Sequence, residues 1–420
     1  MSKTKKIIPE FRFPEFKDSG EWDVKTLGEV LIKNSKKNKN QKYSQVESVS
    51  NKFGFIKQDE YFKNRRVASK DTSNYYVIKK GYFAYNPSRI DVGSLAYKHN
   101  DEISIISPLY VSFKANNELI NDYFLLSFFN SVTFTKQMIF EGGVRNTLNY
   151  DNLIQSKIPI PTIQEQQRIA SCLSSLDEVI EAHSKKLELL KDHKKGLMQN
   201  LFPQDGETVP KLRFKEFENS GEWEEKKISD LGETISGLTG KSKDDFGAGK
   251  PFVTYKQVFD NSEINFEQCE RVQISDDENQ TSLQQGDILF TTSSETPNEV
   301  GFASVLIDFP KEKTYLNSFC FALRPFNIEK TQPQFSRYLF HSPIYRRSVT
   351  AIAQGSTRYN ISKGAFVEIQ VPIPAPTEQQ KIASCLSSLD EVIEAQVAKI
   401  EQLKLHKKGL MQGLFPKIND

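Results

Sequence analysis

The chain has 420 residues, of which 37% are hydrophobic and 11% aromatic, so it is long enough for about two or three domains with cores of their own. It contains no apolar run of about 18 residues, which argues against a membrane span. No apolar segment follows the lysine-rich first six residues, so we expect no secretory signal and a cytoplasmic protein. The four cysteines have neither metal-site spacing nor the pattern of a disulfide framework.

The net charge of +2 is unevenly distributed along the chain. Residues 1–160 contain 25 Lys and Arg against 17 Asp and Glu, whereas residues 204–370 contain 19 against 25. A basic first half fits a polyanionic partner such as nucleic acid. The acidic second half does not, and local basic clusters would have to make such contacts there.

Three sequence segments occur twice and frame two segments that look unrelated. The pairs are 9–22 with 210–223, 169–182 with 382–395, and 193–199 with 406–412. The second and third pairs are identical in sequence. The unlike segments are roughly 30–140 and 231–353. One duplicated scaffold that presents two different inserts is therefore indicated.

Both inserts have the pattern of mixed α/β domains. Strands are predicted at 75–78, 82–85, 252–255, 286–292 and 319–323, and helices at 120–129 and 335–345. A glycine-containing loop follows each predicted helix, at 143–148 and 355–361. These loops place Arg145 and Arg358 at equivalent positions of the repeat.

The identical segments predict two long helices. Prolines precede both, Thr162 or Thr377 can cap the start, and Glu165 would complete a capping box with Thr162. Apolar residues then recur at alternating steps of four and three for more than four heptads, which is typical of a coiled-coil seam. Each helix of about 38 residues would be roughly 57 Å long. The predicted seam comprises Ile169, Leu173, Leu176, Ile180, Leu187, Ile382, Leu386, Leu389, Ile393 and Ile400.

These patterns predict an α+β protein with a pseudo-two-fold internal repeat. Two mixed globular domains would be joined by two long helices that form an antiparallel coiled coil. The expected segments are 1–160 for the first globular domain, 161–203 for the central helix, 204–373 for the second globular domain and 374–420 for the C-terminal helix.

No catalytic constellation is recognisable. The segment 247–250 lacks the glycine spacing of a phosphate-binding loop, and Asn86-Pro87 begins a methyltransferase motif that Ser88 does not continue. The five histidines lack zinc-ligand spacing, and no nucleophile elbow occurs. We therefore expect no catalytic residue and no metal site in this chain.

Basic clusters are the candidate nucleic-acid contacts, although each could also be a solvated surface loop. An arginine in a glycine-flanked loop can bind a phosphate or guanine, or can simply pair with a neighbouring carboxylate. The candidate DNA-binding residues are Lys36, Lys37, Arg65, Arg66, Lys79, Lys80, Arg89, Arg145, Asn146, Lys250, Lys256, Arg346, Arg347, Arg358 and Tyr359.

The chain resembles, along its whole length, the DNA-specificity subunit of Type I restriction-modification enzymes. Ile-Pro-Ile-Pro at 158–161 and Val-Pro-Ile-Pro at 371–374 each lead into Glu-Gln-Gln and a heptad helix. Gly-Asp-Ile-Leu at 286–289, the two arginine loops and the Leu-Phe-Pro that ends each helix complete the match. The lead-in that ends at Trp22 is similar to that of staphylococcal members.

The resemblance implies that each insert is a target-recognition domain that reads one half of a split site in double-stranded DNA. The helices would space the halves and dock two methyltransferase subunits, which use S-adenosylmethionine. Endonuclease-translocase subunits, which use ATP and Mg²⁺, would join them. The chain itself would bind no cofactor and catalyse nothing. The alternative hypothesis is a coiled-coil assembly scaffold whose inserts bind proteins, which the acidic second insert favours slightly.

Overall fold

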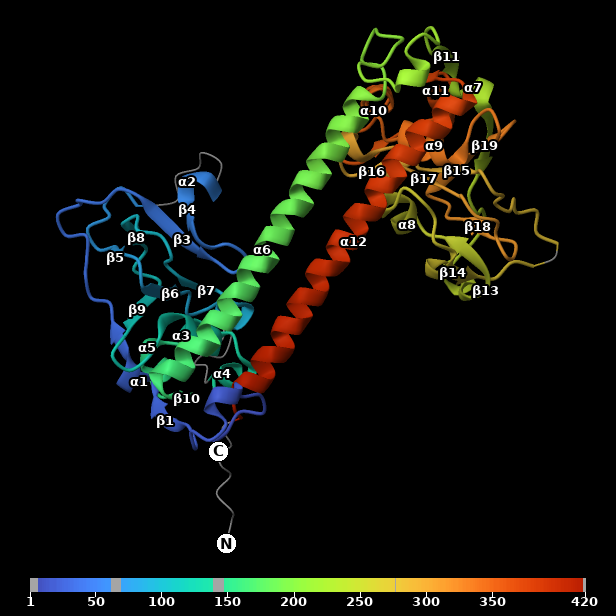
Figure 1. The fold of residues 1–420 in the computed structure, drawn as a ribbon. Helices are drawn as coiled ribbons and strands as arrows, with labels where there is room; N and C mark the ends of the chain where they lie inside the picture. The colour runs from blue at the N-terminus through green and yellow to red at the C-terminus, as the bar shows by residue number, and fades with distance from the viewer. Residues whose placement is uncertain (1–6, 62–68, 139–146, 276, 418–420) are drawn as a thin grey trace. The chain divides into compact units, whose positions relative to one another are not determined.

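A computed structural model describes residues 7–61, 69–138, 147–275 and 277–417, and the chain forms two compact units. Unit 1 comprises residues 1–184 and 398–420, and unit 2 comprises residues 185–397. Each unit therefore includes one insert and a part of each long helix (Figure 1).

Unit 1 is built on two four-stranded sheets. The antiparallel first sheet has the order β2 (Leu31–Lys33), β9 (Val111–Ala115), β6 (Tyr82–Tyr85), β7 (Leu95–Tyr97). The second has the order β4 (Gly54–Lys57), β3 (Val46–Ser50), β8 (Ser104–Ile106), β5 (Tyr76–Ile78), and its β3 and β8 are parallel.

Unit 2 repeats this strand order although its insert sequence looks unrelated. Its antiparallel sheet has the order β12 (Gly232–Ser236), β19 (Cys320–Pro325), β15 (Ile288–Thr291), β17 (Ala303–Val305). Its second sheet has the order β14 (Glu270–Val272), β13 (Phe246–Val253), β18 (Tyr315–Leu316), with β13 and β18 parallel. The duplication thus extends into the inserts, where β5 of unit 1 has no counterpart in the sheet of unit 2.

Short elements complete both units. In unit 1 they are the 3-10 helices η1 (Pro14–Phe16) and η2 (Ile90–Val92), the helices α1 (Leu27–Val30), α2 (Gln58–Tyr61), α3 (Asp122–Phe129), α4 (Val132–Thr135) and α5 (Tyr150–Leu153), and the strand pair β1 (Asp23–Thr26) and β10 (Lys157–Ile160). In unit 2 they are η3 (Lys215–Phe217), η4 (Lys243–Asp245), η5 (Phe266–Gln268), η6 (Pro297–Glu299), α7 (Ile228–Leu231), α8 (Tyr255–Asp260), α9 (Pro333–Leu339), α10 (Pro343–Ala351), α11 (Lys363–Val367), and the strand pairs β11 (Glu224–Lys227) with β21 (Gln370–Ile373) and β16 (Ser293–Ser294) with β20 (Tyr359–Asn360).

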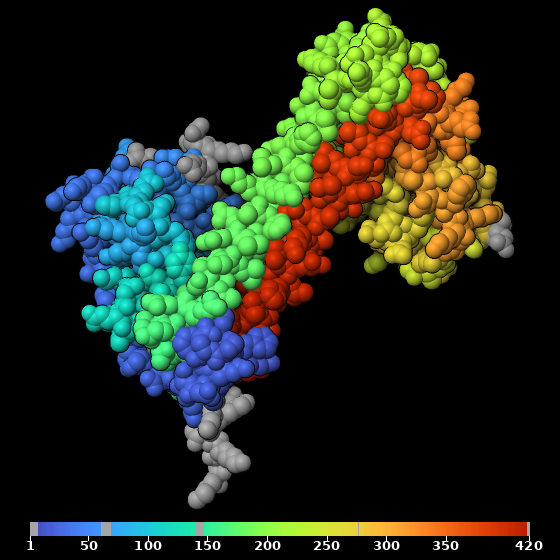
Figure 2. Space-filling view, viewed as in Figure 1, coloured from blue at the N-terminus to red at the C-terminus, as the bar shows by residue number. Residues whose placement is uncertain are grey.

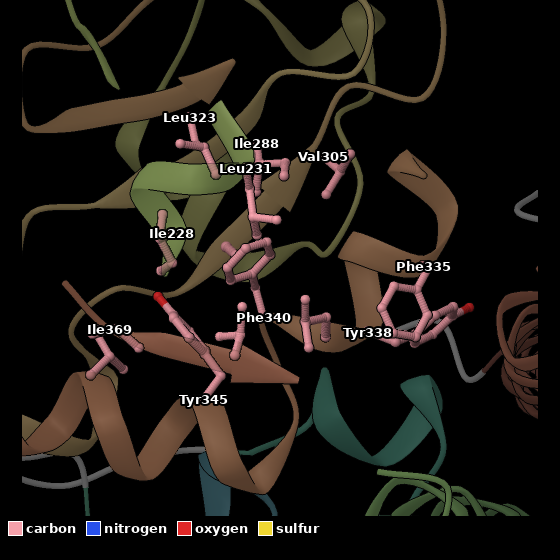
Figure 3. Close-up of a cluster of buried hydrophobic side chains, with 14 of the residues drawn as sticks. Ile228, Leu231, Ile288, Val305, Leu323, Phe335, Tyr338, Phe340, Tyr345 and Ile369 are labelled. Atoms are coloured by element: carbon pink, nitrogen blue, oxygen red, sulfur yellow. The ribbon is translucent and has the colours of Figure 1, made fainter. Parts of the chain in front are cut away.

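The core of unit 2 shows how its helices are attached to its sheet (Figure 3). Ile288 of β15 and Leu323 of β19 supply the sheet side. Phe335 of α9, Tyr345 of α10 and Phe340, which lies between these two helices, pack against them. All five side chains are fully buried. Burying an apolar side chain of this size stabilises the fold by about 1.5–3 kcal/mol, so this cluster fixes the helices on the sheet.

The predicted strands are confirmed as β5, β6, β13, β15 and β19, with small shifts of their ends, and the helix predicted at 120–129 is α3. The single helix predicted at 335–345 is wrong, because the structure has two helices there, α9 and α10. Pro343 has no backbone N–H to continue the hydrogen-bond pattern of α9, so a single helix cannot run through this position. A new helix begins there, and the Ser342 hydroxyl caps it by accepting the Tyr345 N–H.

The two long helices are α6 (Ile163–Asn200) and α12 (Pro376–Leu414). In unit 1, Asp177 of α6 binds Lys407 of α12, and Leu173 packs in one cluster with Met411 and Leu414. In unit 2, Lys194 binds Asp390, and Leu197 lies against the cluster that contains Leu386. Within each unit the two helix segments therefore run antiparallel, as the prediction required, and they lie side by side in Figure 2.

The predicted seam positions are the sheltered ones on both helices. Ile169, Leu173, Ile382, Leu386 and Ile400 are buried. Leu176, Ile180, Leu187, Leu389 and Ile393 are half-buried, whereas most positions between them are exposed. The 3.5-residue pattern therefore identified the packed face of each helix.

The entry of each helix is fixed by a buried arginine–glutamate–tryptophan cluster. In unit 1, the Arg12 guanidinium donates two hydrogen bonds of 2.8 Å to the Glu165 carboxylate, which also accepts the Trp22 indole N–H. The expected capping box is therefore only half right. The Thr162 hydroxyl does accept the Glu165 N–H, at 3.4 Å, but the Glu165 carboxylate is bound to Arg12.

The second copy has the same cluster, made by Arg213, Glu378 and Trp223. Here the expected cap Thr377 is wrong, since it lies inside α12, and the residue equivalent to Thr162 is Ala375. The Ala375 carbonyl accepts the Glu378 N–H instead.

Candidate nucleic-acid interface

In both units a loop that precedes the long helix returns to the end of the central strand. The Leu148 N–H donates to the Pro87 carbonyl in unit 1, and the Ile361 N–H donates to the Thr292 carbonyl in unit 2, each at 3.0 Å. Pro87 and Thr292 follow the corresponding strands β6 and β15. Leu148 and Ile361, the last residues of the predicted arginine loops, are therefore anchored at corresponding places of the two sheets.

In unit 2 this anchoring places Arg358 at the edge of a hollow. β20, which contains Tyr359, pairs with β16, so that Tyr359 lies opposite Ser294. Arg358, just before it, is exposed and lines a hollow of about 450 Å³. The hydroxyl-bearing Ser293 and Ser294 also line this hollow, which we name the Arg358 hollow. Tyr359 itself lies against the core of unit 2.

Aromatic and acidic side chains complete the Arg358 hollow. Tyr255 and Phe259 of α8 stack with their ring centroids 5.9 Å apart, and Phe319 is 59% exposed. Glu295 and Glu299 supply two carboxylates. Burial raises the pKa of Tyr255, whose hydroxyl donates to the Ser293 carbonyl at 2.6 Å. The sequence analysis did not predict these residues as part of a binding site. It assigned Tyr255 and Phe319 to strands, and it treated acidic residues only as unfavourable for DNA binding.

In unit 1 the structure brings four predicted lysines to one strand. The segment that contains Lys36 and Lys37 runs beside β5, where the Val77 N–H donates to the Lys36 carbonyl at 2.9 Å. The Lys37 Nζ lies 3.2 Å from the centre of the Tyr76 ring. Lys79 and Lys80 follow β5 directly, and Lys80 pairs with Asp101 at 3.2 Å.

The other candidates of unit 1 belong to the loop region after β6. Arg89 is exposed there and follows β6, whereas Lys79 and Lys80 precede this strand. The Ser88 hydroxyl lies 3.5 Å from that of Thr147, so Thr147 lies beside the loop that contains Arg89. Four predicted residues lie outside the described part of the chain, namely Arg65, Arg66, Arg145 and Asn146.

The remaining candidates of unit 2 are not gathered into one patch. Lys250 is exposed on β13, Lys256 pairs with Asp260 within α8, and Arg347 pairs with Asp205. Arg346 is directed into the protein, where it donates to the Gly301 and Asn298 carbonyls at 3.1 and 2.9 Å. Its burial lowers its pKa.

A second, more basic hollow of about 520 Å³ lies in unit 2 between the end of α6 and the helices α9 and α10. Lys191, Lys194 and Lys195 form one of its walls, and Arg337, which sequence reasoning missed, faces them. Lys194 and Arg337 both contact Asp390, at 2.5 and 3.7 Å. These cations therefore partly neutralise a half-buried carboxylate, which limits their use for an external anion.

Neither a metal-ligand cluster nor a membrane-spanning helix occurs among the residues that the structure describes. No group of three or more His, Cys, Asp or Glu side chains in residues 7–61, 69–138, 147–275 and 277–417 is arranged to hold a metal ion. Within the same residues, none of the helices is both long and apolar enough to cross a bilayer.

Solved structures share the architecture. One chain from a study of assembly and conformational transition of the type I restriction-modification system has a TM-score of 0.59 at 18% identity, covering 94% of this chain and 97% of that one. The S subunit of a Type I restriction-modification system from M. genitalium has a TM-score of 0.55 at 13% identity, covering 98% and 100%. At these identities the likeness shows the fold.

Sequence relatives point to the same family. A putative type I restriction enzyme specificity subunit, MjaX of Methanocaldococcus jannaschii, is 25% identical over 94% of this chain and 93% of its own length. The EcoKI specificity subunit of Escherichia coli is 30% identical over 31% of this chain and 27% of its own. Residues 19–192 and 220–405 each match the family described as the type I restriction modification DNA specificity domain. The chain therefore belongs to the type I restriction-modification DNA specificity family, and it contains that domain twice.

Proposed function

We propose that each unit reads one half of a bipartite DNA site for a type I restriction-modification complex. The observation that carries this proposal is the coincidence of the two specificity domains with the two units, which share a sheet plan but differ in the side chains at the return loops. The role is recognition, as the names of the relatives as specificity subunits indicate. The match does not favour the alternative of a protein-binding scaffold.

The helices would set the spacing between the halves and dock two copies of one methyltransferase subunit. Support comes from residues that are identical in the two copies although they are exposed. These are Ser171, Ser175, Glu178, Val179, Glu181 and Ala182, with Ser384, Ser388, Glu391, Val392, Glu394 and Ala395. Exposed side chains usually contribute less than about 0.5 kcal/mol to stability, so packing does not demand this identity.

The neighbouring part of the helices provides the contrast. Six of the ten positions 183–192 differ from their counterparts at 396–405, including Leu189, which is 62% exposed. A recent duplication alone would have left this stretch identical as well. Identity that extends to the exposed positions of 169–182 and 382–395 is what two equal binding events would require.

The remaining subunits would contribute the chemistry. S-adenosylmethionine would be bound by the methyltransferase subunits, and ATP and Mg²⁺ by endonuclease-translocase subunits. We place the assembly in the cytoplasm, where the DNA of a bacterial cell is found. In this arrangement the present chain determines only which DNA sequence the other subunits act on.

The test is reconstitution with the methyltransferase partner and labelled duplex DNA. We expect salt-sensitive, sequence-dependent binding by fluorescence anisotropy, and a complex with two methyltransferase subunits by mass measurement. Val179→Lys or Val392→Lys should reduce the stoichiometry to one, and the double variant to none. Leu405→Lys, at a still more exposed position outside the identical stretch, is the control. Binding that is independent of sequence would refute the proposed function.

The spacing role has its own test. Inserting one heptad into the middle of both α6 and α12 adds about 10.5 Å of helix, or roughly three base pairs at 3.4 Å each. Methylation mapping should then show both half-sites unchanged and the spacer about three base pairs longer. An unchanged spacer in an active complex would contradict the role of the helices as a ruler.

A further inference from the structure

The Arg358 hollow of unit 2 contains opposite charges that do not pair with each other. Arg358 and Glu295 are both exposed, and among the described residues neither has an ion-pair partner. Glu299 differs, because its carboxylate accepts the hydroxyls of Ser294 and Thr296 at 3.0 and 2.8 Å and so holds the loop in shape. The hollow therefore offers a free guanidinium donor and a free carboxylate acceptor.

This combination selects the chemistry of the ligand. Two carboxylates make the hollow unfavourable for a phosphate, and Arg358 makes it unfavourable for a simple cation. A neutral edge that carries both an amino donor and adjacent acceptors satisfies both charges. The exposed ring of Phe319 and the stacked rings of α8 give the hollow apolar walls against which a planar group can pack.

A G·C base pair presents such an edge in the major groove of DNA. Cytosine offers the N4 amino group as a donor, and guanine offers O6 and N7 as acceptors. A glutamate can accept from the first, and an arginine can donate two hydrogen bonds to the second. The two groups belong to the same base pair, so one hollow can contact both.

We propose that the Arg358 hollow reads one G·C base pair in the half-site of unit 2, with Glu295 bound to the cytosine amino group and Arg358 to guanine. This inference rests on the proposed function. It also explains how an acidic unit recognises DNA, because here a carboxylate contributes selectivity.

The experiment uses the assembled complex of the chain with its methyltransferase partner. The half-sites are first mapped by methylation sequencing, and anisotropy competition is then run with duplexes that carry all four base pairs at each position. Glu295→Gln adds an amide donor while keeping the shape, and Arg358→Lys keeps the charge while losing the bidentate geometry. Glu329→Gln, at an exposed glutamate outside the hollow, is the matched control.

We expect both variants to bind the original site about 10- to 100-fold more weakly, with preference lost or altered at one and the same G·C position. The other half-site, the urea unfolding curve and the control should be unchanged. Unchanged preferences in both variants, or an equal loss for all sequences including unrelated DNA, would overturn the inference. If the unaltered complex shows no sequence dependence, the proposed function fails instead.

Discussion

Arg213 and Glu378 form a buried ion pair in unit 2, with nitrogen–oxygen distances of 2.8 and 2.7 Å and side chains that are 7% and 1% exposed. The two residues are 165 positions apart. The hydrogen bonds to Glu378 raise the pKa of Arg213, and the Trp223 indole donates to the same carboxylate. The pair therefore ties the lead-in segment to the first turn of α12.

Removing one partner should strongly destabilise unit 2. Glu378→Ala leaves a buried guanidinium without its counter-charge, which typically costs 3–5 kcal/mol of unfolding free energy. Urea unfolding measures this loss. Glu216→Ala breaks the exposed pair with Lys381 and should leave the unfolding midpoint almost unchanged, because water and salt screen an exposed pair. A loss of similar size in both variants would show that the buried pair has no special role.

The repeated sequence segments already indicated the buried arginine–glutamate–tryptophan cluster. Arg12, Trp22 and Glu165 are each identical to their counterparts Arg213, Trp223 and Glu378, and the same hydrogen bonds join the three residues in both copies. The predicted capping role for Glu165 considered only neighbours in sequence. A contact across 153 residues outcompeted the local one, because a buried carboxylate gains more from a guanidinium than from a backbone N–H.

The common sheet plan of the inserts could not be predicted from sequence. Phe83 and Ile288 occupy corresponding strands but differ in size and shape, and their neighbours differ as well. Many combinations of apolar residues satisfy the same buried strand, so unlike sequences can form one topology. The seam of the helices was predictable, because a 3.5-residue period is a property of one segment alone. The carboxylates of the Arg358 hollow were not, since their meaning depends on which side chains face them.

Asp177 and Asp390 occupy equivalent positions of the repeat, but their surroundings differ. We therefore expect their substitutions to lower the unfolding free energy by unequal amounts. Asp177 is 56% exposed and binds Lys407. Asp390 is 13% exposed, binds Lys194 and accepts the Tyr338 hydroxyl at 2.9 Å. Asp390→Ala should cost about 2–3 kcal/mol, whereas Asp177→Ala should cost less than about 1 kcal/mol. Equal midpoints in urea unfolding would contradict this difference.

His341 predicts a pH dependence of the stability of unit 2. Burial lowers its pKa to about 4, and the charges of Arg346, Lys194 and Arg337 act in the same direction. The unfolded chain has a pKa near 6.5 at this residue, so between pH 6.5 and 4 the unfolded state binds the extra proton. Stability should therefore fall as the pH decreases through this range, by at most about 3 kcal/mol at 1.36 kcal/mol per pKa unit.

The measurement needs a reporter of unit 2 alone. Trp22 lies in unit 1 and Trp223 in unit 2, so a Trp22→Phe background leaves the fluorescence of Trp223 to follow unit 2 in urea. His341→Gln in that background should flatten the dependence of the unfolding free energy on pH between 6.5 and 4. An unchanged slope would show that His341 is protonated in the folded state as easily as in the unfolded one.

The lysines beside β5 predict a sequence-independent contribution to DNA binding. Lys36 and Lys79 are exposed and have no side-chain partner among the described residues, whereas Lys80 pairs with Asp101. A free lysine that contacts a phosphate releases one counterion, and each such contact adds about 0.9 to the slope of log affinity against log salt. The double variant Lys36→Ala and Lys79→Ala should therefore bind every sequence more weakly and lower that slope by about 2.

Lys80→Ala is the matched control, since it removes a neighbouring charge that is already neutralised. It should change the slope much less than the double variant does. The substitution leaves the Asp101 carboxylate unpaired, but it removes no lysine that contacts a phosphate. A titration series from low to high salt on specific and unrelated duplexes gives both slopes. If the double variant instead altered base preference at constant slope, these lysines would belong to the reading surface of unit 1 and not to its phosphate contacts.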